Sequence, residues 1–520
     1  MKAEKKVEQE EEEAVKGGEL LFCGATRRKA IGGRNVGNFV SLTRLRPLVG
    51  VNIRLVVSGC ASFHCVALDV EGRCYTWGRN EKGQLGHGDT MQRDMPAVVS
   101  KLSQHIVVGA AAGRNHTVLV TKYGLSFSFG WNKHGQLGTG SSKNEVESSP
   151  VHSLVSEVRT AACGADFSVW LTSVEGASIL TAGLPQYGQL GHGTDNEYNT
   201  KSSSVRLAYE AQPCPKTLAS LAGETIVKVA CGTNHTVAVD SNGFVYTWGF
   251  GGYGRLGHRE QKDEWIPRRV DIFTKHNVLP PDAIISAGSL NSACTAGGGQ
   301  LYMWGKIKNA GDDWMYPKPL MDLSGWNIRC MDLGNTHHFV GAETSCISWG
   351  QSLSGELGYG PDEQKSSTNP KKVEILEGMH VISVACGFAH SMVVVDRMNV
   401  GDLLDQFDVY DDKTSGKGSE ELESKFSVAK KTNKMGAYKT SENSEKRKSK
   451  DSSELEDKEK DSDDESDDSE EQVNGQAEQK MQRGGKTGRG LNSGALKPTP
   501  EKKSAQSARG KGKSAKRGRR

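Results

Sequence analysis

Short apolar runs separated by glycine-rich polar turns recur from about residue 18 to residue 396. One such unit, residues 230–257, reads ACGTNHTVAVDSNGFVYTWGFGGYGRLG. Its apolar runs are rich in Val, Tyr and Trp, and Gly, Asn and Asp bound them, which is the pattern of short β-strands joined by tight turns. The pattern predicts an all-β segment about 380 residues long, built from repeats.

The repeat returns seven times. The first glycines of the units are Gly59, Gly113, Gly164, Gly232, Gly288, Gly334 and Gly387. Steps of 46 to 68 residues between these glycines fit a propeller blade with variable loops and do not fit a helical repeat. A second motif, W-G followed five residues later by G-x-L-G, keeps its spacing wherever it survives, so the geometry within a blade is constant while the loops vary.

One repeat is divided between the two ends of the repeat region. Residues 18–24, GELLFCG, look like a W-G strand without its A-C-G partner, and residues 385–390, ACGFAH, are an A-C-G strand without its W-G partner. We expect the two to pair, which would close the ring and remove the exposed sheet edges of an open array. Six complete units and one split unit predict a seven-bladed β-propeller.

Positions that recur in the repeats are expected to build the fold. The glycines of G-x-L-G supply turn conformations, and the leucine between them is expected to insert into the neighbouring blade. The residue before the W-G glycine is expected to be a core aromatic side chain. These aromatic residues are Trp77, Phe129, Trp248, Trp304 and Trp349.

Histidine and cysteine also recur at fixed positions. The histidines are His64, His116, His235, His337 and His390; the third and fifth repeats have Phe167 and Asn291 instead. Because they belong to different blades, they are not expected to share a metal, and we predict that each is buried and holds a backbone carbonyl. The cysteine before the blade glycine exchanges with Ala and Leu, which indicates a packed apolar position.

The composition divides the 520 residues into three parts. Hydrophobic residues are only 35% of the chain, so part of it is not expected to form a core. We predict a charged disordered head at residues 1–17, the propeller at 18–396, and a disordered tail at 397–520. Within the tail, residues 451–471 contain 13 acidic residues, and residues 480–520 contain 14 Lys or Arg residues against one acid.

The remaining sequence features exclude several classes of protein. The eleven cysteines form no C-x-x-C pair, the chain begins with charged residues instead of a secretory signal, and no apolar run reaches 18 residues. We therefore expect a reduced soluble protein with no membrane contact. No phosphate loop, nucleophile elbow or zinc-protease motif occurs. The prediction is a protein without bond-making chemistry, cofactor or metal.

The units A-C-G-x-x-H-[ST] and W-G-x-x-x-x-G-Q-L-G resemble the repeats of the regulator of chromosome condensation family, across residues 18–396. The family fold is a seven-bladed propeller, in agreement with the count of repeats. Two features depart from what the resemblance implies. One member of the family carries its basic low-complexity segment at the amino end, whereas this chain has its long charged tail at the carboxyl end, and residues 306–320 of the fifth repeat replace the G-x-L-G turn. The motif of the family's plant ultraviolet-B photoreceptor, G-W-R-H-T, is absent.

The resemblance implies a function. The founding member is an exchange factor for the small GTPase Ran and binds nucleosomes, and another member is nuclear, associates with chromosomes and the spindle, and is linked to Rho- and Ral-type GTPases. It therefore implies a non-catalytic, chromosome-associated regulator that binds a small GTPase or chromatin, with spindle or cytoskeletal proteins as further partners. The alternative is a guanine nucleotide exchange factor for a Ran-, Rac- or Ral-type GTPase. The expected location is the nucleus, with a cytoplasmic pool left open.

Charged loops are the expected partner-binding sites, because a propeller binds through the loops on its faces. The segment 250–269, in which Arg255 replaces the glutamine of G-Q-L-G, is the strongest candidate, and the loop of the first repeat is its counterpart; a solvated loop is the alternative in each case. The candidate residues are Arg79, Glu81, Lys82, Arg255, Arg259, Lys262, Asp263 and Glu264.

The tail contains two further kinds of candidate. Basic clusters for nuclear import or nucleic-acid contact are Lys446, Arg447, Lys448, Lys511, Lys513, Lys516, Arg517, Arg519 and Arg520. The acidic run surrounds three serines that suit an acidophilic kinase, Ser462, Ser466 and Ser469. A tail that only keeps the protein soluble is the alternative interpretation of both.

Overall fold

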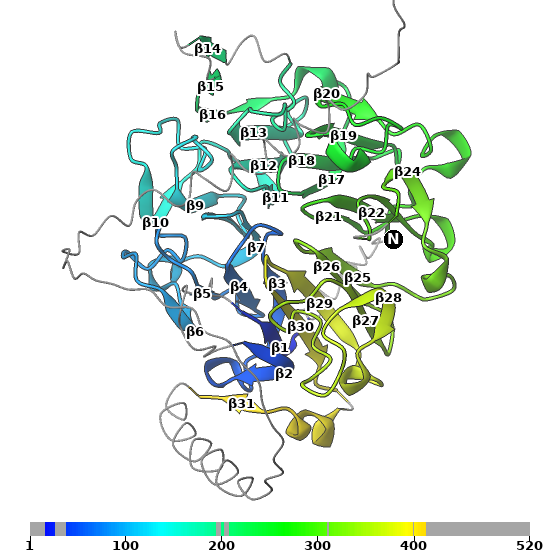
Figure 1. Ribbon diagram of the computed structural model, residues 1–520. Helices are drawn as coiled ribbons and strands as arrows, with labels where there is room; N and C mark the ends of the chain where they lie inside the picture. Colours follow the sequence, from blue (N-terminus) through cyan, green and yellow to red (C-terminus); the bar gives the residue numbers. More distant parts are fainter. Residues whose placement is uncertain are drawn as a thin grey trace, which may run out of the picture. The chain divides into compact units, whose positions relative to one another are not determined.

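The computed structural model describes residues 16–25, 38–193, 199–201, 207–308, 311–398 and 400–411. All of them lie in one compact unit of the chain. The described residues form seven four-stranded antiparallel blades, and each continuous blade is built from four strands consecutive in its sheet (Figure 1). No helix in this described part is long and apolar enough to cross a membrane. The predicted all-β propeller is confirmed.

The strands of the six continuous blades run in order from the innermost to the outermost. They are β3 (Ile53–Val57), β4 (His64–Asp69), β5 (Cys74–Gly78) and β6 (Arg93–Val98); β7 (Val107–Ala112), β8 (His116–Thr121), β9 (Ser126–Trp131) and β10 (Val146–His152); β11 (Val158–Cys163), β12 (Phe167–Thr172), β13 (Ile179–Gly183) and β16 (Gln212–Thr217); β17 (Ile226–Cys231), β18 (His235–Asp240), β19 (Val245–Gly249) and β20 (Glu264–Arg269); β21 (Ile285–Ala287), β22 (Asn291–Thr295), β23 (Leu301–Gly305) and β24 (Trp314–Pro319); and β25 (Cys330–Leu333), β26 (His337–Gly341), β27 (Cys346–Gly350) and β28 (Ser367–Lys372).

Short elements occupy the connections. A small hairpin, β14 (Asn199–Lys201) with β15 (Leu207–Tyr209), extends the loop of the third blade. The 3-10 helices are η1 (Arg46–Leu48), η2 (Ser100–Leu102), η4 (Ala219–Leu221), η5 (Gly252–Gly254), η6 (Lys275–Asn277), η7 (Gly297–Gly299), η8 (Met321–Leu323), η9 (Glu374–Leu376) and η10 (Gly401–Gln406).

The seventh blade joins the two ends of the repeat region, as predicted. β1 (Gly18–Gly24) pairs with β30 (His390–Asp396) over its whole length, from Gly18 opposite Asp396 to Gly24 opposite His390. β29 (Val381–Cys386) lies inside β30, and β2 (Phe39–Leu45) lies outside β1. The amino-terminal part therefore supplies two strands, one more than the sequence pattern predicted.

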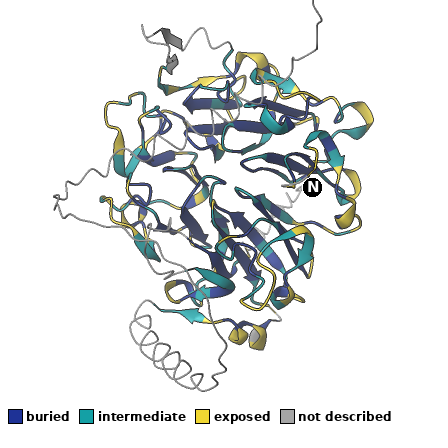
Figure 2. Cartoon of the chain, viewed as in Figure 1, coloured by how far each residue is buried: buried dark blue, intermediate teal, exposed yellow. Residues whose placement is uncertain are grey.

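Neighbouring blades interlock through the G-x-L-G loops. The five leucines of this motif, Leu85, Leu137, Leu190, Leu256 and Leu357, are at most 1% exposed. The glycine after each leucine meets the next blade closely: a Cβ on Gly86 would lie 2.8 Å from the ring of Phe129. The backbone of Gly86 also has a positive φ. Glycine is therefore favoured for two reasons, the close approach of the ring and the backbone conformation. The predicted apolar insertion and aromatic core are confirmed, and the inner strands form the buried layer in Figure 2.

Two blades achieve the same packing with other residues. The third blade has Ala182 where the others have an aromatic residue, and Trp170 from the neighbouring strand β12 fills that core instead. In the fifth blade, which lacks G-x-L-G, Ile307 packs in the cluster that contains Trp349 of the sixth blade. The packing requirement is therefore for apolar volume at the seam, and the motif is one way to meet it.

The recurring histidines are buried, but the prediction that they hold backbone carbonyls is wrong. His116 Nε2 lies 2.9 Å from Ser168 Oγ in the next blade, and His64, His235, His337 and His390 contact next-blade hydroxyls at 2.8 to 3.1 Å. Ser168 Oγ in turn donates to the Gln136 carbonyl. Because this hydroxyl proton is committed to the carbonyl, Nε2 is the donor to the hydroxyl. The Nε2 of His116 therefore reaches the Gln136 carbonyl through the Ser168 hydroxyl of the next blade.

The packed chain extends beyond the predicted tail boundary at residue 397. We call residues 397–398 and 400–411 the C-terminal strap. It contains η10 and ends in β31 (Val409–Tyr410), which pairs in parallel with β2. Val400, Leu404 and Phe407 are buried in the cluster of the seventh blade. The sequence analysis missed these three buried residues because polar residues separate them at irregular intervals.

Each blade exposes loops on two opposite faces, because its strands alternate in direction. The loops after the first and third strands share one face, which we call the G-x-L-G face; those after the second and fourth strands form the opposite face. Innermost strands enclose a central cavity of about 160 Å³ lined mainly by small residues, with Asp332 at its wall. Burial raises the pKa of Asp332 to about 6.

Candidate partner-binding surface

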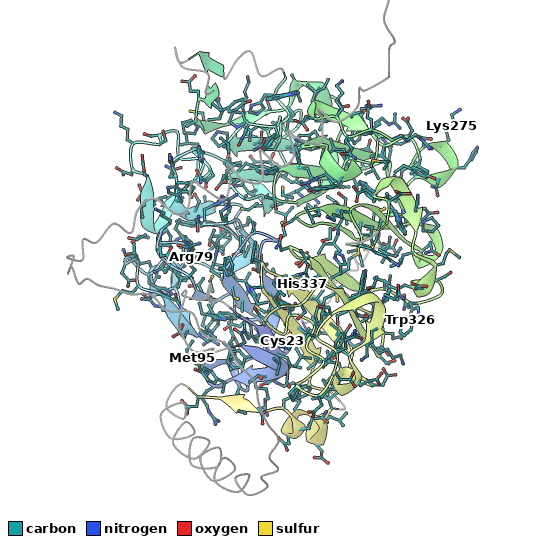
Figure 3. All side chains as sticks on the ribbon, in the orientation of Figure 1. Cys23, Arg79, Met95, Lys275, Trp326 and His337 are labelled. Atoms are coloured by element: carbon teal, nitrogen blue, oxygen red, sulfur yellow. The ribbon has the colours of Figure 1, made fainter. Side chains whose placement is uncertain are left out.

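The candidate residues of the first repeat lie on the G-x-L-G face, where Figure 3 labels Arg79. The Arg79 guanidinium forms an ion pair with Glu81, so these two charges cancel. Lys82 forms no ion pair among the described residues. Its ammonium lies 5.7 Å from the ring centre of Trp131 at the end of β9. Lys82 is thus the one candidate of this loop that presents an uncompensated charge.

Lys82 belongs to a second cluster that the sequence analysis missed. Lys133 also lies 5.7 Å from the Trp131 ring centre, so two lysines from adjacent blades share one indole. Trp131 is half-buried, and the ring holds the cations in place through its quadrupole. The sequence feature that could have revealed this cluster is Trp131 itself. It occupies the position directly after the W-G glycine, where the first and fifth repeats have a basic residue.

Arg255 does not lie on the surface. It is 3% exposed, and its Nη1 donates to the Ser289 carbonyl of the next blade at 2.7 Å. The guanidinium also lies over the ring of Phe250 at 4.5 Å. Arg255 replaces the glutamine of G-Q-L-G, which is buried in the other copies. The departure from the repeat therefore reflects the contact between blades four and five, and Arg255 is not available to a partner.

Arg259, a further candidate of the segment 250–269, is exposed. The Arg259 guanidinium lies 4.4 Å from the ring centre of Tyr316 on β24, and Lys318 lies 5.2 Å from the same ring. Tyr316 is thus flanked by two cations, one from each blade. Lys262 is exposed as well. None of the three cations forms an ion pair with another residue of the described chain.

The carboxylates of this segment have local partners. Asp263 accepts the Gly251 amide at 2.8 Å, and burial raises its pKa. Glu264 and Glu260 both bind Arg268 at 2.7 Å. The predicted mixed-charge loop is therefore divided: its acids stabilise the loop, while its outer cations remain open to solvent.

A further cation belongs to the same region. Lys306, in the degenerate loop of the fifth repeat, lies 5.1 Å from the ring centre of Tyr253. We call Arg259, Lys262, Lys306 and Lys318, with Tyr253 and Tyr316, the cation–aromatic patch. Sequence analysis found two of its six members, because the other four lie on a neighbouring loop and strand or carry no charge.

The basic and serine candidates between residues 446 and 520 lie outside the described residues.

The fold and the repeats together define the class: a seven-bladed propeller built from A-C-G and W-G repeats. The family model for the regulator of chromosome condensation repeat matches residues 71–120, 123–171, 178–239, 242–293 and 345–394, and a second model of the same repeat matches residues 56–84 and 226–255. The chain belongs to the regulator of chromosome condensation repeat family.

Individual relatives agree with this assignment. The chain is 40% identical over 405 residues to Protein RCC2 of Homo sapiens, which covers 72% of this chain and 76% of that protein. It is 38% identical over 404 residues to the Protein RCC2 homolog of Danio rerio. It is 31% identical over 355 residues to the ultraviolet-B receptor UVR8 of Arabidopsis thaliana, covering 66% of this chain.

Solved structures support the fold. Yeast RCC1 (Prp20) bound to Kap60 superposes with a TM-score of 0.60 at 20% identity, covering 76% of this chain and 92% of that one. A structure of Prp20p from Saccharomyces cerevisiae, described with its binding properties to Gsp1p and histones, gives a TM-score of 0.57 at 19% identity and covers 79% of this chain and 96% of that chain. At these identities the likeness concerns the fold alone.

Proposed function

We propose that this chain is a non-catalytic, chromosome-associated regulator that binds a small GTPase through the cation–aromatic patch of blades four and five. The observation that carries the proposal is the pair of cations around Tyr316, the exposed Arg259 and the half-buried Lys318, which lie against its ring and form no ion pair with another described residue. Such cations are positioned before binding, so a partner with complementary carboxylates pays little to order them.

A protein partner fits this surface better than a nucleic acid does. Asp312 and Asp313 lie on the same loop as Lys306, and Glu260 lies beside Arg259 in the chain. Carboxylates interspersed among the cations would repel a continuous row of phosphates, whereas a protein surface can match both signs. The basic tail clusters remain the proposed route to chromatin and nuclear import, since they contain cations with few acids.

Binding is tested with the full chain and a panel of purified Ran-, Rac- and Ral-type GTPases carrying a labelled nucleotide. Reversing Arg259 and Lys318 together (R259E/K318E) is expected to weaken the complex at least about tenfold, because like charges then face each other. Matched controls reverse Lys122 and Lys275, exposed residues in loops of the opposite face (Lys275 is labelled in Figure 3). These controls should leave binding unchanged.

The same experiment separates binding from exchange. A stoichiometric complex without faster nucleotide release supports the regulator, and faster release that the double variant abolishes supports the alternative of a guanine nucleotide exchange factor. Exchange needs only tighter binding of the nucleotide-free GTPase, so it requires no catalytic motif. Binding that is the same for R259E/K318E and the wild type would overturn the proposed surface.

A further inference from the structure

A cleft of about 290 Å³ lies on the opposite face, between the fifth and sixth blades. Its walls are the turn 324–327, which follows η8, and the loop 342–345, which joins β26 to β27. The turn is fixed by backbone bonds, since the Trp326 amide donates to the Leu323 carbonyl and the Ile328 amide donates to the Trp326 carbonyl. Trp326, labelled in Figure 3, is half-buried and packs on the core cluster of these blades.

The indole of Trp326 already accepts a cation within this molecule. The Lys372 ammonium lies 5.6 Å from its ring centre, and Glu377 binds the same ammonium at 2.9 Å. Glu377 also accepts a hydrogen bond from Ser345, which lines the cleft. The cleft is thus lined by an aromatic ring and by the acidic residue Glu343, and Glu377 adjoins its wall at Ser345. An aromatic ring and a carboxylate together bind ammonium and guanidinium groups.

The charge around the cleft is acidic. Glu343 lines it with an exposed side chain, and Asp322 lies two residues before its first wall residue. In the described chain neither carboxylate makes an ion pair or a side-chain hydrogen bond. Two cations of the described chain lie beside the cleft: Lys372, which pairs with Glu377, and Arg329, which donates to His380.

Trp131 on the G-x-L-G face provides the contrast. It is half-buried like Trp326, but Lys82 and Lys133 both lie over its ring, and neither has a carboxylate partner in the described residues. Two half-buried indoles on opposite faces therefore have different electrostatic surroundings. One is suited to a cation and the other to an anion.

We propose that the Trp326 cleft binds a Lys or Arg side chain from a basic segment of another protein. The cation would lie against the indole and pair with Glu343, while Asp322 attracts the neighbouring basic residues of the segment. The two faces of the propeller would then take partners of opposite charge. This proposal does not depend on the GTPase-binding patch, which lies on the other face, at the seam between blades four and five.

The test measures binding of short acetylated peptides to the full chain by calorimetry at low salt. The basic nonapeptides (GSR)3 and (GSK)3 are expected to bind, and the acidic (GSE)3 is not. Trp326→Leu should weaken the basic peptides by roughly fivefold to thirtyfold, while Trp326→Phe, which keeps a ring, should retain most of the affinity. Trp131→Leu is the matched control and should have no effect.

A second variant predicts a gain. Lys372→Gln removes the internal cation from the Trp326 ring and leaves the Glu377 carboxylate unpaired, so it should tighten binding of the basic peptides severalfold. Lys372 is exposed enough that the change should not disturb folding, and Glu343→Gln, also exposed, should weaken binding. These two variants decide the question even where Trp326→Leu fails to fold.

The proposal is overturned by any of three results: no binding of the basic peptides, equal binding to the wild type and Glu343→Gln, or weaker binding after Lys372→Gln. Equal affinity for (GSR)3 and (GSE)3 would also contradict it, since the cleft would then not discriminate charge.

Discussion

The outer strands of the blades are protected against pairing with other chains in two different ways. An outer strand exposes unpaired amides that another chain can pair with, and proline, which has no amide hydrogen, blocks such pairing. Every continuous blade has proline in its outer strand. These prolines are Pro96, Pro150, Pro213, Pro215, Pro267, Pro317, Pro319 and Pro370. The split blade has none in β2, and there β31 of the C-terminal strap covers the edge (Figure 1).

The outer edge of the split blade is therefore protected by another strand of the chain, whereas the outer edges of the continuous blades are protected by their own prolines. The strap also contributes Arg397 to a buried ion cluster in this blade. Glu19 on β1 is 1% exposed and binds Arg44 at 3.0 Å and Arg397 at 2.6 Å. Arg397 lies at the start of the strap, so the residues that close the ring and those that cover its edge are linked.

The largest expected effect comes from removing the strap. A chain ending at Asp396 loses the burial of Val400, Leu404 and Phe407 and leaves Glu19 without one partner. The expected loss is more than about 5 kcal/mol of unfolding free energy, since each buried apolar side chain contributes about 1.5–3 kcal/mol and a broken buried pair costs about 3–5 kcal/mol. Urea unfolding and light scattering measure it, because the bare β2 edge should also promote association.

A chain ending at Asp411 is the control for that truncation. It lacks the tail but keeps the strap, and it should unfold at the same urea concentration as the full chain and stay monomeric. Equal stability of the two truncated chains would show that the strap contributes nothing to closure.

The next effect isolates the ion cluster from the strap's apolar contacts. Glu19→Ala leaves two partly buried arginines, Arg44 and Arg397, without their shared carboxylate, and the expected cost is about 3–5 kcal/mol. The measurement is the shift in urea midpoint. The variant Glu19→Ala/Arg397→Leu should recover part of the loss; no recovery would mean that the carboxylate acts through Arg44 and the Gly50 amide alone.

Acid should weaken the seams between blades, including the seam of the split blade. Burial lowers the pKa of His390 to about 3 from an unperturbed 6.5. Between these values the unfolded chain binds a proton that the folded chain does not, so the stability from neutral His390 is complete above pH 6.5 and is lost as the pH falls toward 3. His390→Gln should cost about 1 kcal/mol at pH 7 and should reduce the further loss between pH 7 and pH 5.

His235→Gln, within the continuous fourth blade, is the counterpart. Burial lowers the pKa of His235 as well, so the two variants should respond to acid alike. A larger response of one seam would show that the seams do not behave as equivalent contacts. Urea midpoints at the two pH values supply both comparisons.

The smallest effect is expected at the surface. Glu81→Gln breaks the pair with Arg79, in which the Glu81 side chain is 60% exposed. Solvent screens such pairs, and the expected change is below about 1 kcal/mol. The contrast with Glu19→Ala, measured under the same conditions, tests whether burial makes the difference between the two carboxylates.

Much of the fold was predictable because the repeat could be compared with itself. Seven copies revealed which positions are buried, and the pairing of residues 18–24 with the carboxyl-terminal strand followed from the missing halves of one unit. The strap could not be predicted in this way, because no other copy contains it. Its composition resembles the polar tail that follows, and three buried apolar residues at irregular spacing give no periodic signal.

The binding surface was predicted less well, for a physical reason. Arg255 was predicted to be a site residue because it departs from the repeat. In the structure, the arginine at this position instead makes a buried contact between blades. A charge in the sequence does not show whether its partner is a neighbouring carboxylate, as for Glu264, or an aromatic ring, as for Arg259. The ring of Tyr316 lies more than 50 residues from Arg259 in the chain, so only the packed blades bring them together.

The sequence alone determined the number of blades, the strands of the recurring motifs and most of the residues at the seams. These properties depend on local hydrogen bonding and on apolar volume, which the repeat displays seven times. The tertiary structure decided which charges are exposed, how the split blade is closed and where an indole meets a carboxylate. Those properties depend on distances between loops of different blades, and no pattern within one repeat records such distances.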